Sequence, residues 1–236
     1  MLEKLKKEVC QANKDLQKFG LVILTWGNVS GISDDRKYIV IKPSGVEYDT
    51  LLPNDMVVVD LSNSKKIEGK LNPSSDTQTH IELYRNFKNI KGIVHTHSNW
   101  ATSFAQAELP IKCYGTTHAD YFYGDIPCTR KLINREIENN YEQNTGKVIV
   151  ETFVKNNYDY NNIPAVLVSN HGPFVWGSSP QNAVHNAYVL ENIAELAYKT
   201  KTLNLKILTI DKNLLDKHYL RKHGKNAYYG QSAKRK

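Results

Sequence analysis

Short runs of β-forming residues alternate with helical periods along the chain, and this mixture constrains the fold more than any other feature. The expected strands cover residues 21–24, 38–41, 56–60, 92–97, 148–152, 165–169 and 174–176, and the expected helices cover residues 2–19, 77–87, 99–107 and 180–199. No internal repeat or long linker interrupts this order. With 40% hydrophobic residues among 236, the pattern predicts one α/β domain with a single large core.

The composition argues against a membrane-spanning or secreted protein. No apolar run approaches the roughly 20 residues that a membrane-spanning helix needs, and residues 1–7 lack the apolar core of a secretory signal. The cysteines are Cys10, Cys113 and Cys128, without a CxxC pair, which favours neither a disulfide framework nor a cysteine metal site. We therefore expect a soluble, cytoplasmic protein with reduced thiols.

The formal charge of +7 is concentrated at the C-terminal end. Seven cationic side chains and no Asp or Glu lie between Lys217 and Lys236, so the positive and negative charges of the rest of the chain cancel. A nucleic-acid-binding protein more often carries a basic face with interleaved aromatic residues over its main surface, and we recognise no such module. We expect no nucleic-acid or membrane partner, and a solvated basic tail at residues 232–236.

Two histidines, His95 and His97, end an apolar run of strand length. On a strand, this spacing places both imidazoles on one face, about 7 Å apart along the backbone. By itself the pair fits a chance placement as well as a metal site. A third histidine, His171, follows another apolar run where Gly172 and Pro173 favour a turn. Three neutral imidazoles with an open position are the pattern of a catalytic zinc site, with Asp76 as a fourth ligand or, alternatively, a helix N-terminal acid.

Other polar clusters could bind an anion or transfer protons. Residues 27–30, 42–45 and 73–75 combine small residues with hydroxyl and backbone N–H donors, which can cradle a phosphate but also make ordinary turns. Residues 115–124 and 215–230 are unusually dense in functional side chains, and within them Asp120 and Tyr229 could exchange protons. By composition alone, the second stretch is better explained as a solvated C-terminal helix.

Taken together, these segments resemble the class II aldolase and epimerase superfamily and, within it, the L-ribulose-5-phosphate 4-epimerases. The likeness is carried by TWGNVS (25–30), KPSGV (42–46), PSSDT (73–77), HTH (95–97), GTTHADYFYG (115–124), HGPF (171–174) and residues 216–230. It extends over residues 1–231, which we take as the domain, and leaves residues 232–236 outside.

The resemblance implies a role for each matching residue. It implies zinc, or manganese or another divalent ion in its place, on His95, His97 and His171 with Asp76 close by. It implies a substrate phosphate held by Ser44, Gly45, Ser74 and Ser75, with Asn28 and Lys42 nearby. It also implies that Asp120 and Tyr229 are the acid/base pair, with His218 delivered from a neighbouring subunit.

The resemblance further implies a three-layer sandwich, with a central, largely antiparallel sheet between helices, assembled as a homotetramer with sites between subunits. Its reaction interconverts L-ribulose 5-phosphate and D-xylulose 5-phosphate by cleaving and re-forming the C3–C4 bond. The nearest alternative is a metal-dependent sugar-phosphate aldolase of the same superfamily. A non-catalytic scaffold is a further alternative, but it would not need the intact histidines, Asp120 and Tyr229.

Overall fold

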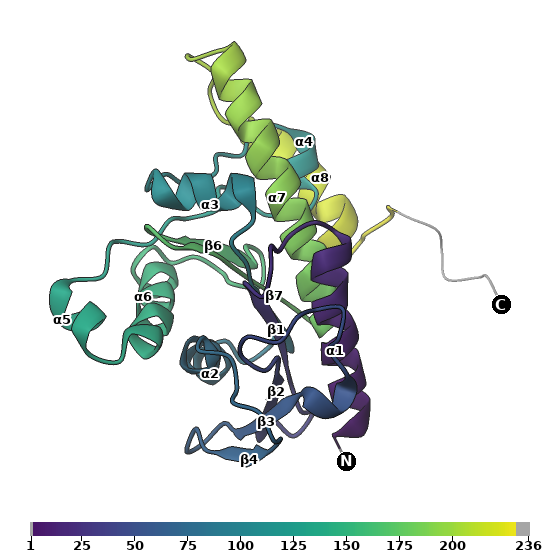
Figure 1. The fold of residues 1–236 in the computed structure, drawn as a ribbon. Helices are drawn as coiled ribbons and strands as arrows, with labels where there is room; N and C mark the ends of the chain where they lie inside the picture. The colour runs from purple at the N-terminus through teal and green to yellow at the C-terminus, as the bar shows by residue number, and fades with distance from the viewer. Residues whose placement is uncertain (1, 230–236) are drawn as a thin grey trace.

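A computed structural model, which describes residues 2–229, contains a seven-stranded sheet with strand order β4-β3-β2-β1-β5-β7-β6 (Figure 1). The strands are β1 (Asn28–Ile32), β2 (Tyr38–Ile41), β3 (Val57–Asp60), β4 (Lys66–Glu68), β5 (Gly92–His95), β6 (Ala165–Val168) and β7 (Gly172–Gly177). Each neighbouring pair is antiparallel. The predicted α/β class with a central antiparallel sheet is therefore confirmed.

Helices cover both faces of this sheet. They are α1 (Glu3–Lys18), α2 (Thr77–Asn86), α3 (Asn99–Gln106), α4 (Thr116–Ala119), α5 (Asn134–Glu138), α6 (Tyr141–Lys155), α7 (Pro180–Leu203) and α8 (Lys212–His223), with a 3-10 turn at Pro53–Asp55. Helices α1, α3 and α7 pack together on one face, and α2 and α6 pack together on the other (Figure 1). The flanking layers expected from the sequence are present.

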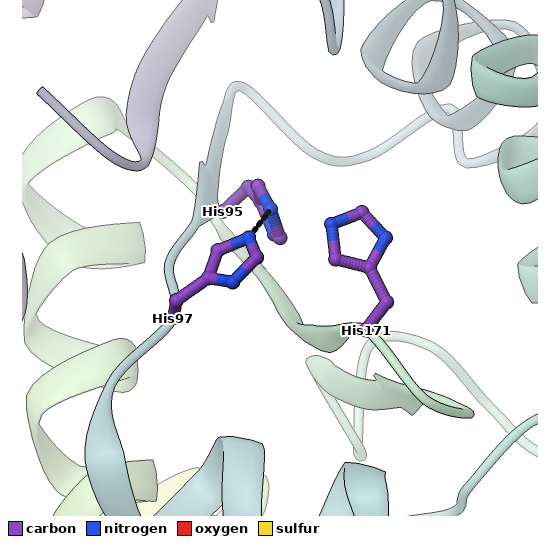
Figure 2. Close-up of side chains that lie close together, drawn as sticks. All are labelled: His95, His97 and His171. Carbon is purple, nitrogen blue, oxygen red and sulfur yellow. Dashed lines mark hydrogen bonds between the residues drawn. The ribbon is translucent and has the colours of Figure 1, made fainter.

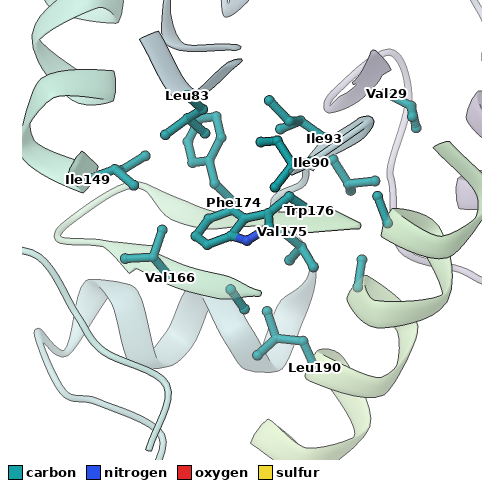
Figure 3. Close-up of a cluster of buried hydrophobic side chains, with 14 of the residues drawn as sticks. Val29, Leu83, Ile90, Ile93, Ile149, Val166, Phe174, Val175, Trp176 and Leu190 are labelled. Carbon is teal, nitrogen blue, oxygen red and sulfur yellow. The ribbon is translucent and has the colours of Figure 1, made fainter. Parts of the chain in front are cut away.

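Large apolar side chains fill the space between the sheet and its helices. Trp176 of β7 is 1% exposed and lies 5.1 Å from the Phe87 ring, between centroids. Figure 3 shows how Leu83 and Ile149 approach the sheet from α2 and α6, while Leu190 approaches it from α7. Because these helices bury apolar stripes against the same sheet, one large cluster forms most of the core, and two smaller clusters lie beside it, one around Val9, Val40 and Met56 and one around Cys113 and Leu215.

The strand predicted at residues 148–152 is wrong, because this segment lies within α6. Its buried residues Val148, Ile149, Thr152 and Phe153 recur at helical spacing on one face. A short β-branched apolar run fits a buried helix as well as a strand, so its composition was misleading.

The strand predicted at residues 21–24 is also wrong. Leu21 is buried, but its N–H donates to the Leu16 carbonyl oxygen, and Leu24 has a φ of 53° in a turn. Conversely, β1 was not predicted, since its first residues were interpreted as turn formers, and β4 was missed because it is short and exposed, with Ile67 as its one apolar residue. The other predicted strands and helices are present, with small shifts at their ends.

The C-terminal helix α8 is anchored by Leu215 and Tyr219, which are 9% and 7% exposed. It is therefore not simply a solvated helix. The predicted tail at residues 232–236 lies outside the described residues. Between residues 2 and 229, no helix is both long enough and apolar enough to cross a membrane.

We predict that Gly92→Ala will destabilise the fold. A Cβ atom at this position would lie 2.4 Å from the Ser179 carbonyl oxygen, which the start of α7 holds in place. Such overpacking costs about 1–3 kcal/mol, measurable as a fall in the midpoint of chemical unfolding. Gly115→Ala is the matched control, because its Cβ would meet nothing within 4 Å. Equal losses in both variants would contradict the packing explanation.

Candidate metal centre

Antiparallel pairing brings the candidate site residues to one edge of the sheet. The β1–β5 register places Asn28 opposite His95, and the β5–β7 register places His95 opposite Phe174. Strands β5 and β6 are both antiparallel to β7, so they end at the same edge, where His171 occupies the β6–β7 turn. Lys42 follows the end of β2 at this edge. Residues from four distant parts of the sequence thus converge.

His95 is fixed from behind by backbone and ring contacts. Its Nδ1–H donates to the Pro173 carbonyl oxygen, 2.9 Å away, and its ring stacks on Phe174 at a centroid distance of 4.2 Å. Because Nδ1 is used for this hydrogen bond, Nε2 is the ring nitrogen left for a ligand. His95 Nε2 lies 3.1 Å from His97 Nε2 (Figure 2).

His97 is positioned by the start of the next helix. The carboxylate of Glu191 on α7 accepts hydrogen bonds from the Trp100 and Ala101 N–H groups, at 2.7 and 3.0 Å. Both N–H groups belong to the first turn of α3, which begins at Asn99, two residues after His97. Nothing in the sequence singled out Glu191, because its position on the long helix α7 resembles that of any exposed acid.

His171 completes a group of three imidazoles (Figure 2). Its ring centroid lies 4.7 Å from that of His95 and 5.0 Å from that of His97, and the three candidate ligand atoms all lie within 4.8 Å of one another. Burial, reinforced by the neighbouring histidines, lowers the pKa of His171 to about 3 and also lowers the pKa of His97. His171 and His97 are therefore neutral near pH 7, with lone pairs available.

These three nitrogens fit a divalent metal ion. Two imidazole nitrogens on a tetrahedral zinc ion lie about 3.3 Å apart, close to the separation of His95 Nε2 and His97 Nε2. Neutral imidazoles are ligands that Zn²⁺ and other transition metals accept. The predicted histidine triad is therefore brought together as a candidate metal site.

Asp76 lies at the pocket but outside this group of three ligand atoms. It occupies the N-cap position of α2, yet its carboxylate does not cap the helix; Oδ2 instead accepts a hydrogen bond from Asn28 Nδ2 at 2.7 Å. Burial favours a higher pKa for Asp76, but His95, His80 and the Asn28 amide outweigh it and hold the pKa below its usual range. Asp76 is thus an ionised carboxylate beside the histidines.

The histidines share one pocket of about 540 Å³ with the predicted anion-binding residues. The pocket is lined by Asn28, Lys42, Ser44, Gly45, Ser74, Ser75 and Asp76, and also by Tyr141 and Glu142. The sequence analysis missed Tyr141 and Glu142, because they begin the helix that was misread as a strand.

Lys42 is a buried cation in the wall of this pocket. It is 1% exposed, and burial lowers its pKa to about 8, although Glu47 counteracts this. Its ammonium group lies 4.7 Å from the centroid of the Tyr48 ring and 3.4 Å from the Pro43 carbonyl oxygen. Within residues 2–229 it forms no ion pair with a carboxylate, so an anion entering the pocket would find an uncompensated positive charge.

The predicted acid/base residues form a second cluster that does not line this pocket. The Asp120 carboxylate accepts hydrogen bonds from His218 Nδ1 and Arg221 Nη2, each at 3.0 Å, and Lys222 Nζ lies 3.4 Å away. Tyr229 is 59% exposed, and its ring lies beside Arg221 and Lys222 at 4.7 and 4.6 Å. The sequence analysis counted Arg221 and Lys222 only as charges of the C-terminal end.

Comparison with known families gives the class of the protein. The family described as "Class II Aldolase and Adducin N-terminal domain" matches residues 7–198, so the chain belongs to this family. The predicted superfamily is thereby confirmed.

Solved structures with the same fold include an L-fuculose 1-phosphate aldolase, which is 23% identical with a TM-score of 0.76 over 91% of this chain and 94% of that one. YgbL from Klebsiella pneumoniae is 26% identical, with a TM-score of 0.72 over 92% and 99% of the two chains. The L-fuculose-1-phosphate aldolase from Thermus thermophilus is 22% identical, with a TM-score of 0.66 over 86% and 98%.

We predict that the purified protein binds about one divalent ion per chain and that His171→Ala lowers the affinity at least tenfold. The substitution removes one of three converging nitrogens. Metal content after gel filtration, measured by elemental analysis, tests this. His185→Ala is the control, since this histidine is exposed and outside the pocket. Unchanged metal content in His171→Ala would exclude the triad as the binding site.

We also predict that Asp120 stabilises the fold in a pH-dependent way. Burial tends to raise the pKa of Asp120, but the hydrogen bonds from Arg221 and His218 hold it below its usual value. Since the folded-state pKa lies below the unfolded value of about 3.9, the stabilisation is present above that value and disappears as pH falls through the folded pKa.

Asp120→Asn should therefore lower the melting temperature from about pH 5 upward, and the difference from the parent should shrink below about pH 4. Thermal unfolding across this range measures it. Asp49→Asn serves as the control, because Asp49 is exposed and has no ion pair in the described residues. A melting-temperature difference that is constant with pH would contradict the ionic explanation.

Proposed function

We propose that this protein is a metal-dependent L-ribulose-5-phosphate 4-epimerase, which interconverts L-ribulose 5-phosphate and D-xylulose 5-phosphate. The observation that carries the proposal is one pocket in which three converging imidazoles lie beside a buried lysine that has no carboxylate partner among residues 2–229. The imidazoles suit a divalent ion and the lysine suits a phosphate, so the pocket suits a small phosphorylated sugar.

Zinc, or manganese in its place, would supply a Lewis acid on His95, His97 and His171 with Asp76 beside them. The residues themselves set up this chemistry. His95 is held by Pro173 and Phe174 with its lone pair outward, and Asp76 is kept ionised among the histidines. The preorganised arrangement requires little movement during the reaction.

The other end of the pocket would hold the phosphate. Lys42 offers a buried ammonium group, and within the described residues the hydroxyls of Ser44 and Ser75 make no competing hydrogen bond. Gly45 provides a backbone N–H in a left-handed turn, with a φ of 68°. Ser74 is linked to Asn28 by a hydrogen bond of 3.0 Å, which would keep both at the rim of this subsite.

Inversion at C4 of a 2-ketose requires carbon–carbon cleavage, because the C4 proton is not adjacent to the carbonyl group. Breaking the C3–C4 bond gives a three-carbon enediolate and glycolaldehyde phosphate. Rotation of the aldehyde and re-addition to its other face then give the epimer. The C4 oxygen loses its proton on one side and regains one on the other, so two groups are needed.

Asp120 and Tyr229 are our candidates for these two groups. Asp120 is kept ionised by Arg221 and His218, which suits a proton acceptor, and Tyr229 is an exposed phenol beside the same cations. Since neither residue lines the metal pocket of its own chain, we propose that they serve a neighbouring subunit, together with His218. The enzyme would then be a cytoplasmic homotetramer whose domain spans residues 1–231.

A sugar-phosphate aldolase is the second candidate function. It is favoured by the similar fold of the L-fuculose 1-phosphate aldolases, although at 22–23% identity they share the fold alone. Bond cleavage, metal site and phosphate site would be common to both activities. The non-catalytic scaffold is disfavoured, because a buried uncompensated lysine costs stability unless it serves a ligand.

The test is a coupled assay for D-xylulose 5-phosphate formed from L-ribulose 5-phosphate, with metal content measured on the same sample. We expect turnover that is lost on chelation and restored by zinc or manganese. Tyr229→Phe should lower kcat at least 10²-fold with little change in KM, whereas Tyr228→Phe, its exposed neighbour, should not. Release of dihydroxyacetone phosphate from a ketose 1-phosphate, without epimerisation, would identify an aldolase instead.

A further inference from the structure

His171 differs from the other two histidines in how its ring is held. It lies in the β6–β7 turn directly after Asn170, whose φ is 59°. His95 is fixed by a backbone carbonyl oxygen and a stacked ring, whereas His171 is half-buried in a loop. A ligand at such a position needs an external contact to select its tautomer and to fix its ring.

Tyr141 makes this contact. Its Oη lies 3.2 Å from His171 Nδ1, and the two rings are nearly parallel, 24° apart with centroids separated by 6.1 Å. Among residues 2–229, it is the only hydrogen bond that the His171 side chain forms. Figure 2 shows one ring nitrogen of His171 facing His95 and the other on the far side of the ring. Because Nδ1 is occupied by Tyr141, the nitrogen toward His95 is Nε2.

Tyr141 is itself held in place, because it is the first residue of α6 and this helix packs closely against α2. Thr79 Oγ1 donates a hydrogen bond of 2.6 Å to the Glu142 carbonyl oxygen, next to Tyr141. Further along α6, Gly146 approaches so closely that a Cβ would lie 2.6 Å from Glu82 Cβ. Helix α2 starts immediately after Asp76, so Asp76 and Tyr141 belong to one two-helix unit facing the histidines.

We propose that Tyr141 is the positioning residue for the third metal ligand: its phenol oxygen accepts Nδ1–H of His171 and thereby keeps the Nε2 lone pair directed at His95 and His97. A neutral imidazole carries one proton, so fixing it on Nδ1 leaves Nε2 free to bind a metal. Contacts of this kind outside the ligand set typically contribute 10- to 100-fold to metal affinity.

The inference rests on the metal site of the proposed function but not on its substrate. It also fixes the direction of the hydrogen bond. If the phenol instead donated to Nδ1, the proton of His171 would reside on Nε2, and Tyr141 would oppose metal binding. The sign of the effect on metal affinity therefore distinguishes the two arrangements.

The test is the dissociation constant of Zn²⁺ for the intact protein, measured by competition with a chromophoric chelator in the absence of substrate. Tyr141→Phe keeps the ring and removes the hydroxyl, and we expect the dissociation constant to rise about tenfold. The absorption spectrum of the Co²⁺-loaded variant should also differ from that of the parent, since one imidazole is no longer fixed. The melting temperature of the metal-free protein should not change.

Tyr158→Phe is the matched control, because Tyr158 follows the same helix, packs against Phe153, and has no hydrogen-bonded hydroxyl in the described residues. A Zn²⁺ dissociation constant for Tyr141→Phe within twofold of the parent would overturn the proposal, and so would a tighter one. Because no substrate is present, failure of the epimerase assay leaves this result intact.

Discussion

The pairing of β5 with β1 and β7 is the constraint on which the site depends. It places Asn28, His95 and Phe174 side by side at the edge where β2 and β6 also end. Since a one-residue slip in register turns every side chain to the opposite face, the antiparallel ladder fixes both the position and the direction of the histidine pair. The ladder is held by a core that buries Trp176, Ile93 and Val94 completely or nearly so.

Burial at this edge also determines the electrostatics. Withdrawal from water lowers the pKa values of His97, His171 and Lys42, while the hydrogen bond from Asn28 and the charge that neighbouring histidines can carry hold the pKa of Asp76 below its usual range. A pocket that holds imidazole lone pairs together with a buried ammonium group, which has no carboxylate partner in the described part of the chain, is costly to build. Such a pocket is suited to a cation and an anion that arrive together, as a metal ion and a sugar phosphate do.

Much of the fold and of this pocket could be predicted from the sequence. The histidine triad, Lys42 and the serines at residues 44, 74 and 75 all line it, and the antiparallel sheet between helices is present. The failures have physical causes. The segment 148–152 is buried on one helical face only, which its composition does not reveal, and β1 begins with residues that also suit turns. No sequence pattern indicated Tyr141, Glu142 or Glu191 as site residues. Their contacts depend on how distant helices pack together in the fold.

The sequence by itself determined which chemistry is possible, because imidazole, ammonium and hydroxyl groups keep their ligand preferences in any fold. It also determined the strands and helices whose apolar periods are unambiguous. Only the tertiary structure decided which groups meet. It separated Asp120 and Tyr229 from the metal pocket of their own chain and joined Tyr141 to His171. Those outcomes depend on strand register and on helix packing between residues far apart in the chain. No local sequence pattern encodes which of these residues come into contact.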